Sequence, residues 1–396
     1  MTIYLGVTGT VCSGKGSFTK MLEEKFASLD FNTSDELRQV TAERGLSLER
    51  ENLHVVANES RAKFGADYFA QRCIKKINSL KEKPSVITID GLRTLGEIAS
   101  LEKAFGKNFF MVAIEASQKT RYERAQSRKR AGEHKQTFEE WQAIDNKEYR
   151  LQSNDPNKQN VLACLHACDL VVFNDSTMQA FEESTVSLVN SLLAREKMPL
   201  QKTLAVGFSG PNGAGKTSFY NLARKQYCAL GLSLGDEIRR ELLLHGMELS
   251  RKNMIDLGNE MRRINGEQVL AKRVAERIKR LGRGFYAIDS IYNPSEIDCL
   301  RGELEKFVSF YIDAPQEKRF ERLHARGREG DNKITLEQFR KLDEEQQQGA
   351  HEAGQKLLEC KEKADVVLQN ASTVKEFLQE CAKELEKIGV KRVDKG

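Results

Sequence analysis

The chain has 396 residues, which is too long for one typical domain core, so we expect two or three domains. Hydrophobic residues make up 39% of it, and 28 glycines add to the apolar share, which excludes a largely disordered chain. The 63 Lys and Arg nearly balance the 58 Asp and Glu, so the net charge of +5 gives no broad basic field and makes nucleic acid an unexpected partner.

Neither the apolar runs nor the cysteines indicate a membrane or secreted protein. No stretch approaches the ~20 apolar residues of a membrane helix, and residues 1–7 lack the features of a signal peptide. We therefore expect a cytoplasmic protein. The eight cysteines are scattered, and the close pair Cys164 and Cys168 lies in a mostly apolar run without a second ligand pair at zinc spacing. Buried thiols are the better interpretation of this pair.

Strands alternate with helices along the whole chain. Short apolar runs followed by helical patterns predict strands at 3–7, 86–90, 109–114, 204–208, 285–289 and 307–312. Long charged helices fill most of the remainder. This alternation predicts an α/β fold in which helices cover both faces of a parallel sheet.

The second half of the chain repeats the first at an offset of about 200 residues. The matched pairs include Gly9/Gly210, Lys15/Lys216, Asp35/Asp236, Arg38/Arg239, Arg61/Arg262, Asp90/Asp289, Arg121/Arg319, Arg124/Arg322, Asp145/Asp343 and Asn174/Asn370. Chance does not hold such a register over so many polar positions, so we infer a tandem duplication of a domain-sized unit. We place the domains at 1–197 and 198–396, because residues 195–199 interrupt a helical pattern before a new strand.

The strongest motif lies in the second half. Residues 210–217 match the phosphate-binding loop pattern G-x-x-x-x-G-K-[ST], between a strand and a helix. Its glycines let backbone N–H groups surround a phosphate at the helix N-terminus. Lys216 is expected to reach the β- and γ-phosphates of ATP and Thr217 to hold Mg²⁺. The nucleotide-binding residues of this loop are Gly210, Gly213, Gly215, Lys216, Thr217 and Ser218.

The first half carries a variant of the same loop. Gly9, Gly14 and Lys15 are present, but Gly16 follows the lysine and the hydroxyl moves to Ser17. By the strict pattern this is a mismatch. We nevertheless predict that these five residues bind ATP, because Gly-Lys-Gly is similar to the loop of adenylate kinases.

Further motifs extend this resemblance over nearly all of each half. Both halves resemble nucleoside monophosphate kinases, most closely a poorly characterised archaeal group of adenylate-kinase-like P-loop proteins. Asp35 to Arg38 and Asp236 to Arg239 are similar to that group's G-D-x-[IL]-R motif. Residues 90–93 look like the segment that joins a Walker-B-like acid to a phosphate-binding arginine. The lid arginines of the family resemble Arg121, Arg124, Arg128 and Arg130.

The resemblance implies two tandem P-loop NTPase domains, each with a helical lid, and a role for each matched residue. The implied catalytic residues are Lys15, Asp90, Arg93, Arg124 and Arg128. The implied substrate-binding residues are Asp35, Arg38, Arg61, Arg93, Asp236, Arg239 and Arg262. The implied Mg²⁺-binding residues are Ser17, Asp90, Thr217 and Asp289. Arginine suits these roles, because its planar fork binds phosphate oxygens in pairs.

Some of these residues also have a purely structural interpretation. Arginines on charged helices commonly pair with a neighbouring Glu, and for Arg121 and Arg130 this is as good an explanation as a lid role. Asp145 and Asp343 would order the lid, sense Mg²⁺ or simply lie on a helix surface.

The halves are unequally equipped, and the reaction has alternatives. The second half reads Asp289-Ser290-Ile291-Tyr292 and lacks the arginine, so we expect the first half to carry the chemistry.

The leading reaction is transfer of the γ-phosphoryl group of ATP to a nucleoside or deoxynucleoside monophosphate. A dephospho-coenzyme A or other small-molecule kinase is the nearest alternative. A nucleotide-binding regulatory module with one degenerate half is another, and a nucleic-acid kinase is a weaker one.

Overall fold

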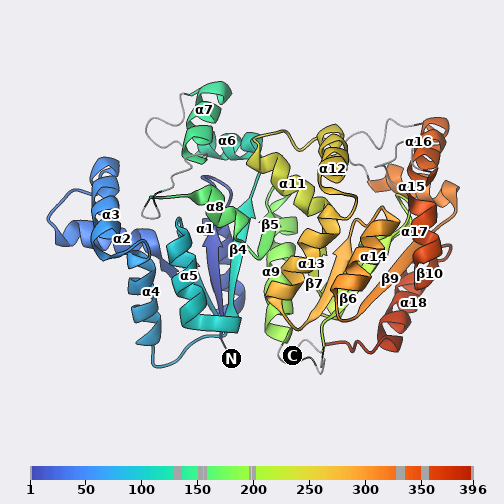
Figure 1. Ribbon diagram of the computed structural model, residues 1–396, viewed down its shortest axis with the longest axis horizontal. Coiled ribbons are helices and arrows are strands. Elements are labelled where there is room, and N and C mark those ends of the chain that lie inside the picture. The colour runs from blue at the N-terminus through green and yellow to red at the C-terminus, as the bar shows by residue number, and fades with distance from the viewer. Residues whose placement is uncertain are drawn as a thin grey trace. The chain divides into compact units, whose positions relative to one another are not determined.

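The computed structural model describes residues 2–128, 136–149, 155, 158–195, 198, 202–326, 335–348 and 356–393. The chain forms two compact units, a first unit of Met1–Val186 with Leu243–Glu248 and a second unit of Ser187–Leu242 with Leu249–Gly396. Each contains one parallel sheet flanked by helices (Figure 1). Our domain limits, 1–197 and 198–396, stay a prediction, because residues 196–197 and 199–201 lie outside the described part. None of the described helices has the length and apolar character needed to cross a bilayer.

The sheet of the first unit has the strand order β2-β3-β1-β4-β5. Its strands are β1 (Ile3–Thr8), β2 (Leu29–Asn32), β3 (Val86–Asp90), β4 (Phe109–Glu115) and β5 (Leu170–Phe173). The central strands β3, β1 and β4 are buried along their whole length, which confirms the strands predicted from apolar runs. The edge strands β2 and β5 were not predicted, because each has only four residues, and the residues of β2 are partly polar and not buried.

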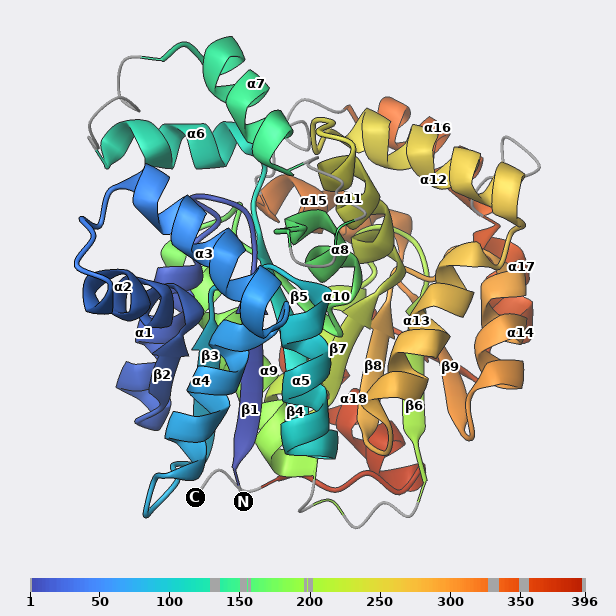
Figure 2. The same ribbon diagram turned by 60° about the vertical axis from the view of Figure 1, so that its left-hand side comes forward.

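Helices cover both faces of this sheet. They are α1 (Lys15–Phe26), α2 (Thr33–Glu43), α3 (Arg50–Phe64), α4 (Tyr68–Asn78), α5 (Leu95–Phe105), α6 (Gln118–Ser127), α7 (Phe138–Tyr149) and α8 (Val161–His166), with a 3₁₀ turn at Gly106–Asn108. Buried residues of α4, α5 and α8 form one core with β1, β3 and β4 (Figure 2). Helix α1 packs against the opposite face, and α9 (Met178–Ala194) leads into the second unit.

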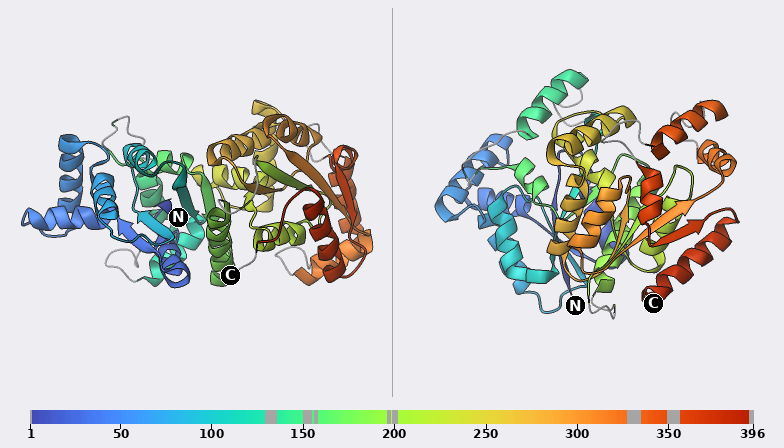
Figure 3. Two further views of the ribbon diagram at one scale, coloured as in Figure 1. Left: turned by 90° about the horizontal axis from the view of Figure 1, so that it is seen from below. Right: turned by 45° about the vertical axis from the view of Figure 1, so that its right-hand side comes forward.

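The second unit repeats this topology. Its sheet has the order β7-β8-β6-β9-β10, from β6 (Leu204–Ser209), β7 (Leu230–Ser233), β8 (Phe285–Asp289), β9 (Phe307–Asp313) and β10 (Val366–Gln369). Its helices are α10 (Lys216–Gln226), α11 (Leu234–Leu244), α12 (Arg251–Asn265), α13 (Val269–Leu281), α14 (Pro294–Glu303), α15 (Gln316–Arg326), α16 (Leu336–Gln348), α17 (Leu357–Lys363) and α18 (Val374–Lys387). Helices α10 and α18 share a core with the strands on one face, and α13, α14 and α17 pack together at the other (Figure 3).

A buried ion pair joins the two lid helices of the first unit. Arg121 of α6 donates from Nη1 and Nη2 to the carboxylate oxygens of Asp145 of α7, at 2.5 and 2.6 Å. The guanidinium also donates from Nε to the carbonyl of Ala116 at 3.1 Å and from Nη1 to that of Val11 at 3.3 Å. Asp145 therefore orders the lid against the phosphate-binding loop and is not a helix-surface acid. Arg319 and Asp343 make the same bidentate pair in the second unit.

Removing the acid of this pair should loosen the lid. Asp145→Ala leaves the Arg121 guanidinium buried without its counter-ion, a change that typically costs about 3–5 kcal/mol. We expect faster amide hydrogen exchange in α6 and α7 of this variant, while α15 and α16 remain as in the parent. The matched variant Asp343→Ala should show the reverse pattern, and unchanged exchange in α7 of Asp145→Ala would contradict the role given to the pair.

Candidate functional site

The phosphate-binding loop of the first unit follows β1, the central strand of the sheet, and leads into α1. Gly14 begins the helix with φ of 109°, and a Cβ there would lie 2.2 Å from Nδ2 of Asn174, so the position requires glycine. The ammonium of Lys15 folds back onto the loop, donating to the carbonyls of Gly9 at 2.8 Å and Thr10 at 3.1 Å. The loop thus has the glycine-lined form that receives phosphate.

An acid lies beside this loop because of the strand register. β1 and β3 are parallel neighbours, and Asp90, the last residue of β3, pairs with Val7 near the end of β1. Asp90 is buried, and it accepts a hydrogen bond from the N–H of Gly91 at 2.6 Å. Burial raises the pKa of Asp90, while the charge of Lys15 opposes this. Loss of hydration lowers the pKa of Lys15 to about 8, against the opposing effect of Asp90.

The donor set beside the loop suits Mg²⁺. Ser17 in the first turn of α1 and Asp90 at the end of β3 offer a hydroxyl and a carboxylate. No group of three or more His, Cys, Asp or Glu side chains that could hold a metal occurs among the residues the structure describes. Mg²⁺ bound with a nucleotide needs no such cluster, because water and phosphate oxygens complete its coordination. In the second unit Asp289 matches Asp90 and Ser218 matches Ser17, while Thr217 offers a further hydroxyl directly after the loop lysine.

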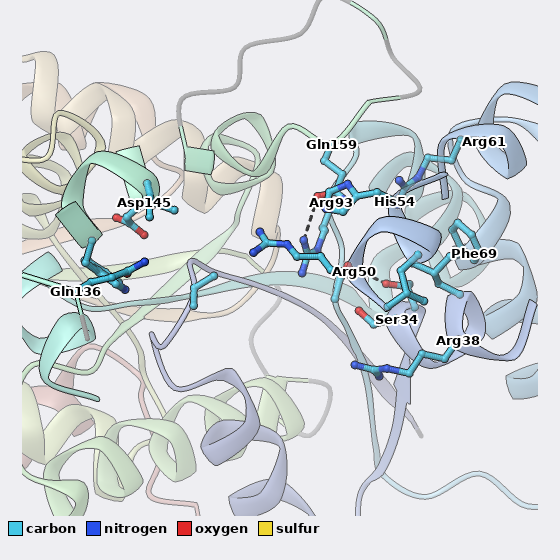
Figure 4. Close-up of a pocket in the computed structure, with 17 residues that line it drawn as sticks. Ser34, Arg38, Arg50, His54, Arg61, Phe69, Arg93, Gln136, Asp145 and Gln159 are labelled. Carbon is cyan, nitrogen blue, oxygen red and sulfur yellow. Dashed lines mark hydrogen bonds between the residues drawn. The ribbon is translucent and has the colours of Figure 1, made fainter. Parts of the chain in front are cut away.

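A cavity of about 670 Å³ in the first unit lies between the loop and helices α2 and α3. Arginines reach it from separate elements, Arg38 from α2, Arg50 and Arg61 from the two ends of α3, and Arg93 from the segment after β3 (Figure 4). The other lining residues include Val11 of the loop, His54, Phe69, Trp141, Asp145 and Gln159. The only acid among the lining residues is Asp145, and Arg121 already pairs with it. The wall is therefore suited to an anion.

Arg93 is held in place from three sides. Its N–H donates to the buried carboxylate of Glu97 at 2.8 Å, and its carbonyl accepts from the N–H of Asn160 at 2.8 Å. Its side chain donates from Nη1 to Oε1 of Gln159 at 3.0 Å, the dashed contact in Figure 4. Because the Gln159 amide is neutral, it orients the guanidinium without cancelling its charge. The positive charge of Arg93 also contributes to the lowered pKa of Lys15, so the two cations act on the same region.

Two further predicted substrate-binding arginines line the cavity, one buried and one half-exposed. Arg61 is buried, with its guanidinium carbon 5.3 Å from the centroid of the Phe69 ring and Nη2 3.6 Å from Glu97. Its Nε and Nη1 have no hydrogen-bond partner among the residues the structure describes. Arg38 is half-exposed and pairs with Asp35 at 2.5 Å, so these two predicted residues contact each other. The structure brings Arg38, Arg61 and Arg93 to one cavity.

The predicted lid arginines behave differently from one another. Arg124 donates from Nη2 to the carbonyl of Asn174 at 2.7 Å, and its Nη1 reaches the carbonyl of Ser13 in the loop at 3.4 Å. Arg124 thus connects α6 to the loop and to Asn174. Arg128 is exposed at the end of α6. Arg130 lies outside the described residues, and Arg121 is committed to Asp145.

The second unit has a loop of the same form but different contacts around it. Gly210, Gly213 and Gly215 all have positive φ, and Lys216 donates to the carbonyls of Gly210 at 2.6 Å and Pro211 at 2.9 Å. Thr217 and Ser218 follow Lys216 in the first turn of α10. Asp236 pairs with Arg239 at 2.5 Å, and Arg262 with Glu296 at 3.0 Å. Asp289 ends β8, as Asp90 ends β3.

Several residues that line the cavity or support its lining were missed in the sequence. Arg50 recurs as Arg251, and Glu97 as Glu296, so the repeat contained a signal for both. His54, Trp141 and Gln159 carry no motif. They reach the cavity only because α3, α7 and the segment before α8 fold around it.

The lowered pKa of Lys15 predicts a pH-dependent affinity for phosphates. In the free loop the ammonium form is lost as the pH rises above about 8. Bound phosphate oxygens favour that ammonium, so binding raises its pKa and takes up protons. Calorimetry of magnesium-ATP binding at pH 8, in buffers of different ionisation enthalpy, should show uptake of roughly half a proton at this site.

Two variants make this measurement specific. Lys216→Ala confines strong binding to the first unit, and the further change Lys15→Arg should abolish the uptake, because a guanidinium stays charged throughout this range. Binding enthalpies that are the same in every buffer would contradict the prediction.

Comparison with known proteins places the chain among P-loop proteins. A family model described as an AAA domain matches residues 5–148. A UPF0200/UPF0201 protein of Archaeoglobus fulgidus is 44% identical over 97 residues, which are 24% of this chain and 30% of that protein. A solved shikimate kinase from Acinetobacter baumannii covers 48% of this chain and 96% of its own, at 15% identity and a TM-score of 0.31. A TM-score of this size carries no conclusion about activity.

One relative matches over almost its entire length. A UPF0200 protein of Thermococcus onnurineus is 31% identical over 189 residues, which are 48% of this chain and 97% of that protein. This match confirms the resemblance to an archaeal P-loop group. The chain belongs to the UPF0200 family of archaeal proteins.

Proposed function

We propose that the first unit transfers the γ-phosphoryl group of ATP to a nucleoside or deoxynucleoside monophosphate. The observation that supports this is a cavity that arginines from separate elements line and that Val11 of the P-loop borders. Lys15 and Asp90 serve the donor, and Arg38, Arg61 and Arg93 serve the acceptor. Such a reaction needs two phosphate groups to be aligned and neutralised, with little covalent chemistry by the protein.

On the donor side, the loop exchanges its internal contacts for phosphate. The Lys15 ammonium leaves the carbonyls of Gly9 and Thr10 and binds the β- and γ-phosphate oxygens, while loop N–H groups hold the β-phosphate. Ser17 and Asp90 would hold a Mg²⁺ ion, which would neutralise charge on the donor phosphates. Burial raises the pKa of Asp90, and a bound cation would lower it and favour the charged carboxylate.

On the acceptor side, Arg93 and Arg38 bind the acceptor phosphate and turn one of its oxygens toward the γ-phosphorus. That oxygen forms the new P–O bond while the bond to the β,γ-bridging oxygen breaks, and ADP leaves with the electron pair. No general base is required, because the acceptor phosphate is already anionic near neutral pH. Arg124 of α6 and Arg128, which directly follows α6, contribute positive charge from the lid side once they engage the phosphates.

Other acceptors would use the same donor side. Dephospho-coenzyme A or another small metabolite is the alternative, since the cavity wall also offers neutral and aromatic groups such as Gln159, His54 and Trp141. All of these acceptors are soluble small molecules, so we propose that the protein works in the cytoplasm and needs no membrane or nucleic-acid partner.

An acceptor screen with the full chain tests the proposal. With magnesium-ATP, we expect ADP formation that depends on an added monophosphate, and Arg93→Ala should lower kcat/KM by about 10³. Gln159→Leu removes the hydrogen bond that orients the Arg93 side chain, which is worth about 1 kcal/mol. It should therefore raise the acceptor KM by about fivefold with little change in kcat. The control Arg263→Ala alters an exposed arginine of α12 and should have no effect.

Each other outcome of the screen has a definite meaning. Turnover with dephospho-coenzyme A or a sugar alone would replace the proposed acceptor. ADP formation that ignores every acceptor, or that survives in Arg93→Ala, would contradict the phosphotransferase role of this cavity.

A further inference from the structure

The second unit has a complete donor loop. Lys216 lies on the carbonyls of Gly210 and Pro211 in the same way that Lys15 lies on its own loop. Gly213 has φ of 78°, and a Cβ there would lie 2.6 Å from the carbonyl oxygen of Arg319, so its close approach to α15 requires glycine. This loop therefore has the features that bind a nucleoside triphosphate.

The residue that faces this loop from the acceptor side is aromatic. Tyr292 replaces Arg93 with the backbone held in the same manner, its N–H donating to Glu296 at 2.9 Å and its carbonyl accepting from Lys356 at 2.8 Å. Its ring centroid lies 6.0 Å from Nζ of Lys216, a cation–π distance. Burial raises the pKa of Tyr292 to about 12, so the phenol stays neutral near pH 7. A neutral ring stands where the first unit has a cation for the acceptor.

The arginine that matches Arg61 is already held in a buried ion pair. Arg262 donates to Oε1 of Glu296 from Nη2 at 3.0 Å and from Nε at 3.3 Å, and both side chains are buried. In the first unit the matching Arg61 is 3.6 Å from Glu97, and its Nε has no hydrogen-bond partner in the described part of the chain. Binding a phosphate at Arg262 would require breaking a buried ion pair, which is costly.

From these contacts we propose that the second unit binds a nucleoside triphosphate with Mg²⁺ and holds it without passing on its γ-phosphoryl group. It keeps the donor loop of a kinase site, while on the acceptor side Tyr292 stands in place of the arginine and Glu296 holds Arg262. A site of this kind reports or stores nucleotide and does not consume it. The proposal concerns a different loop from the transfer reaction of the first unit and stands independently of it.

The test isolates the second loop in the full chain. In Lys15→Met, equilibrium dialysis with magnesium and γ-labelled ATP should find a single equivalent bound per chain, and the labelled nucleotide should be recovered as ATP after incubation with monophosphate acceptors. The double variant Lys15→Met/Lys216→Met should bind at least tenfold more weakly. Trp141 is the only tryptophan and packs against Cys12 of the first loop, so its fluorescence should not respond to ATP in Lys15→Met.

The test distinguishes a failure of this inference from a failure of the function proposed for the first unit. If folded Lys15→Met, checked by circular dichroism, binds no ATP, the second unit is not a nucleotide site. If it forms ADP in proportion to added acceptor, the unit transfers phosphoryl groups and the proposal is wrong. If the parent chain transfers nothing while Lys15→Met still retains ATP, the function proposed for the first unit fails and this inference stands.

Discussion

The structure of each unit is arranged around a lysine ammonium that hydrogen-bonds to the carbonyls of its own loop. An ammonium withdrawn from water is costly unless it is hydrogen-bonded, and Lys15 and Lys216 meet this need with loop carbonyls only 5 or 6 residues away. Phosphate oxygens carry more negative charge than carbonyls, so a triphosphate can take their place. The buried strand and the packed helix on either side hold the loop in place, and its glycines leave room for the phosphate. The lysine can therefore exchange carbonyls for phosphate oxygens.

Buried polar contacts around the loop are the same in both units. Asn174 donates to the carbonyl of Ser13 at 2.9 Å, and Asn370 donates to that of Ala214 at 2.7 Å. The bidentate pair between lid arginine and aspartate also recurs. What changed between the units is the acceptor side, where Tyr292 takes the place of Arg93 on an otherwise equivalent backbone. The loop and its buried contacts have therefore been kept in both units, while the residue at the position of Arg93 differs.

The sequence was most informative where the chain is buried or repeated. The central strands were predictable because parallel strands covered on both faces are continuous apolar runs. The edge strands β2 and β5 escaped, since each is short and partly exposed. The repeat pointed to Asp145 without its role, because its partner Arg121 lies 24 residues earlier and only the fold of the lid brings the two together. Gln159 had no signal at all, since its contact with Arg93 spans 66 residues.

The central claim is that the loop lysine exchanges loop carbonyls for phosphate. A crystal structure of the full chain with magnesium and a non-hydrolysable ATP analogue measures this directly. The account predicts β- and γ-phosphates within the first loop, with the Lys15 ammonium on their oxygens and no longer on Gly9 and Thr10. An analogue bound elsewhere in the first unit, with Lys15 still on those carbonyls, would contradict it.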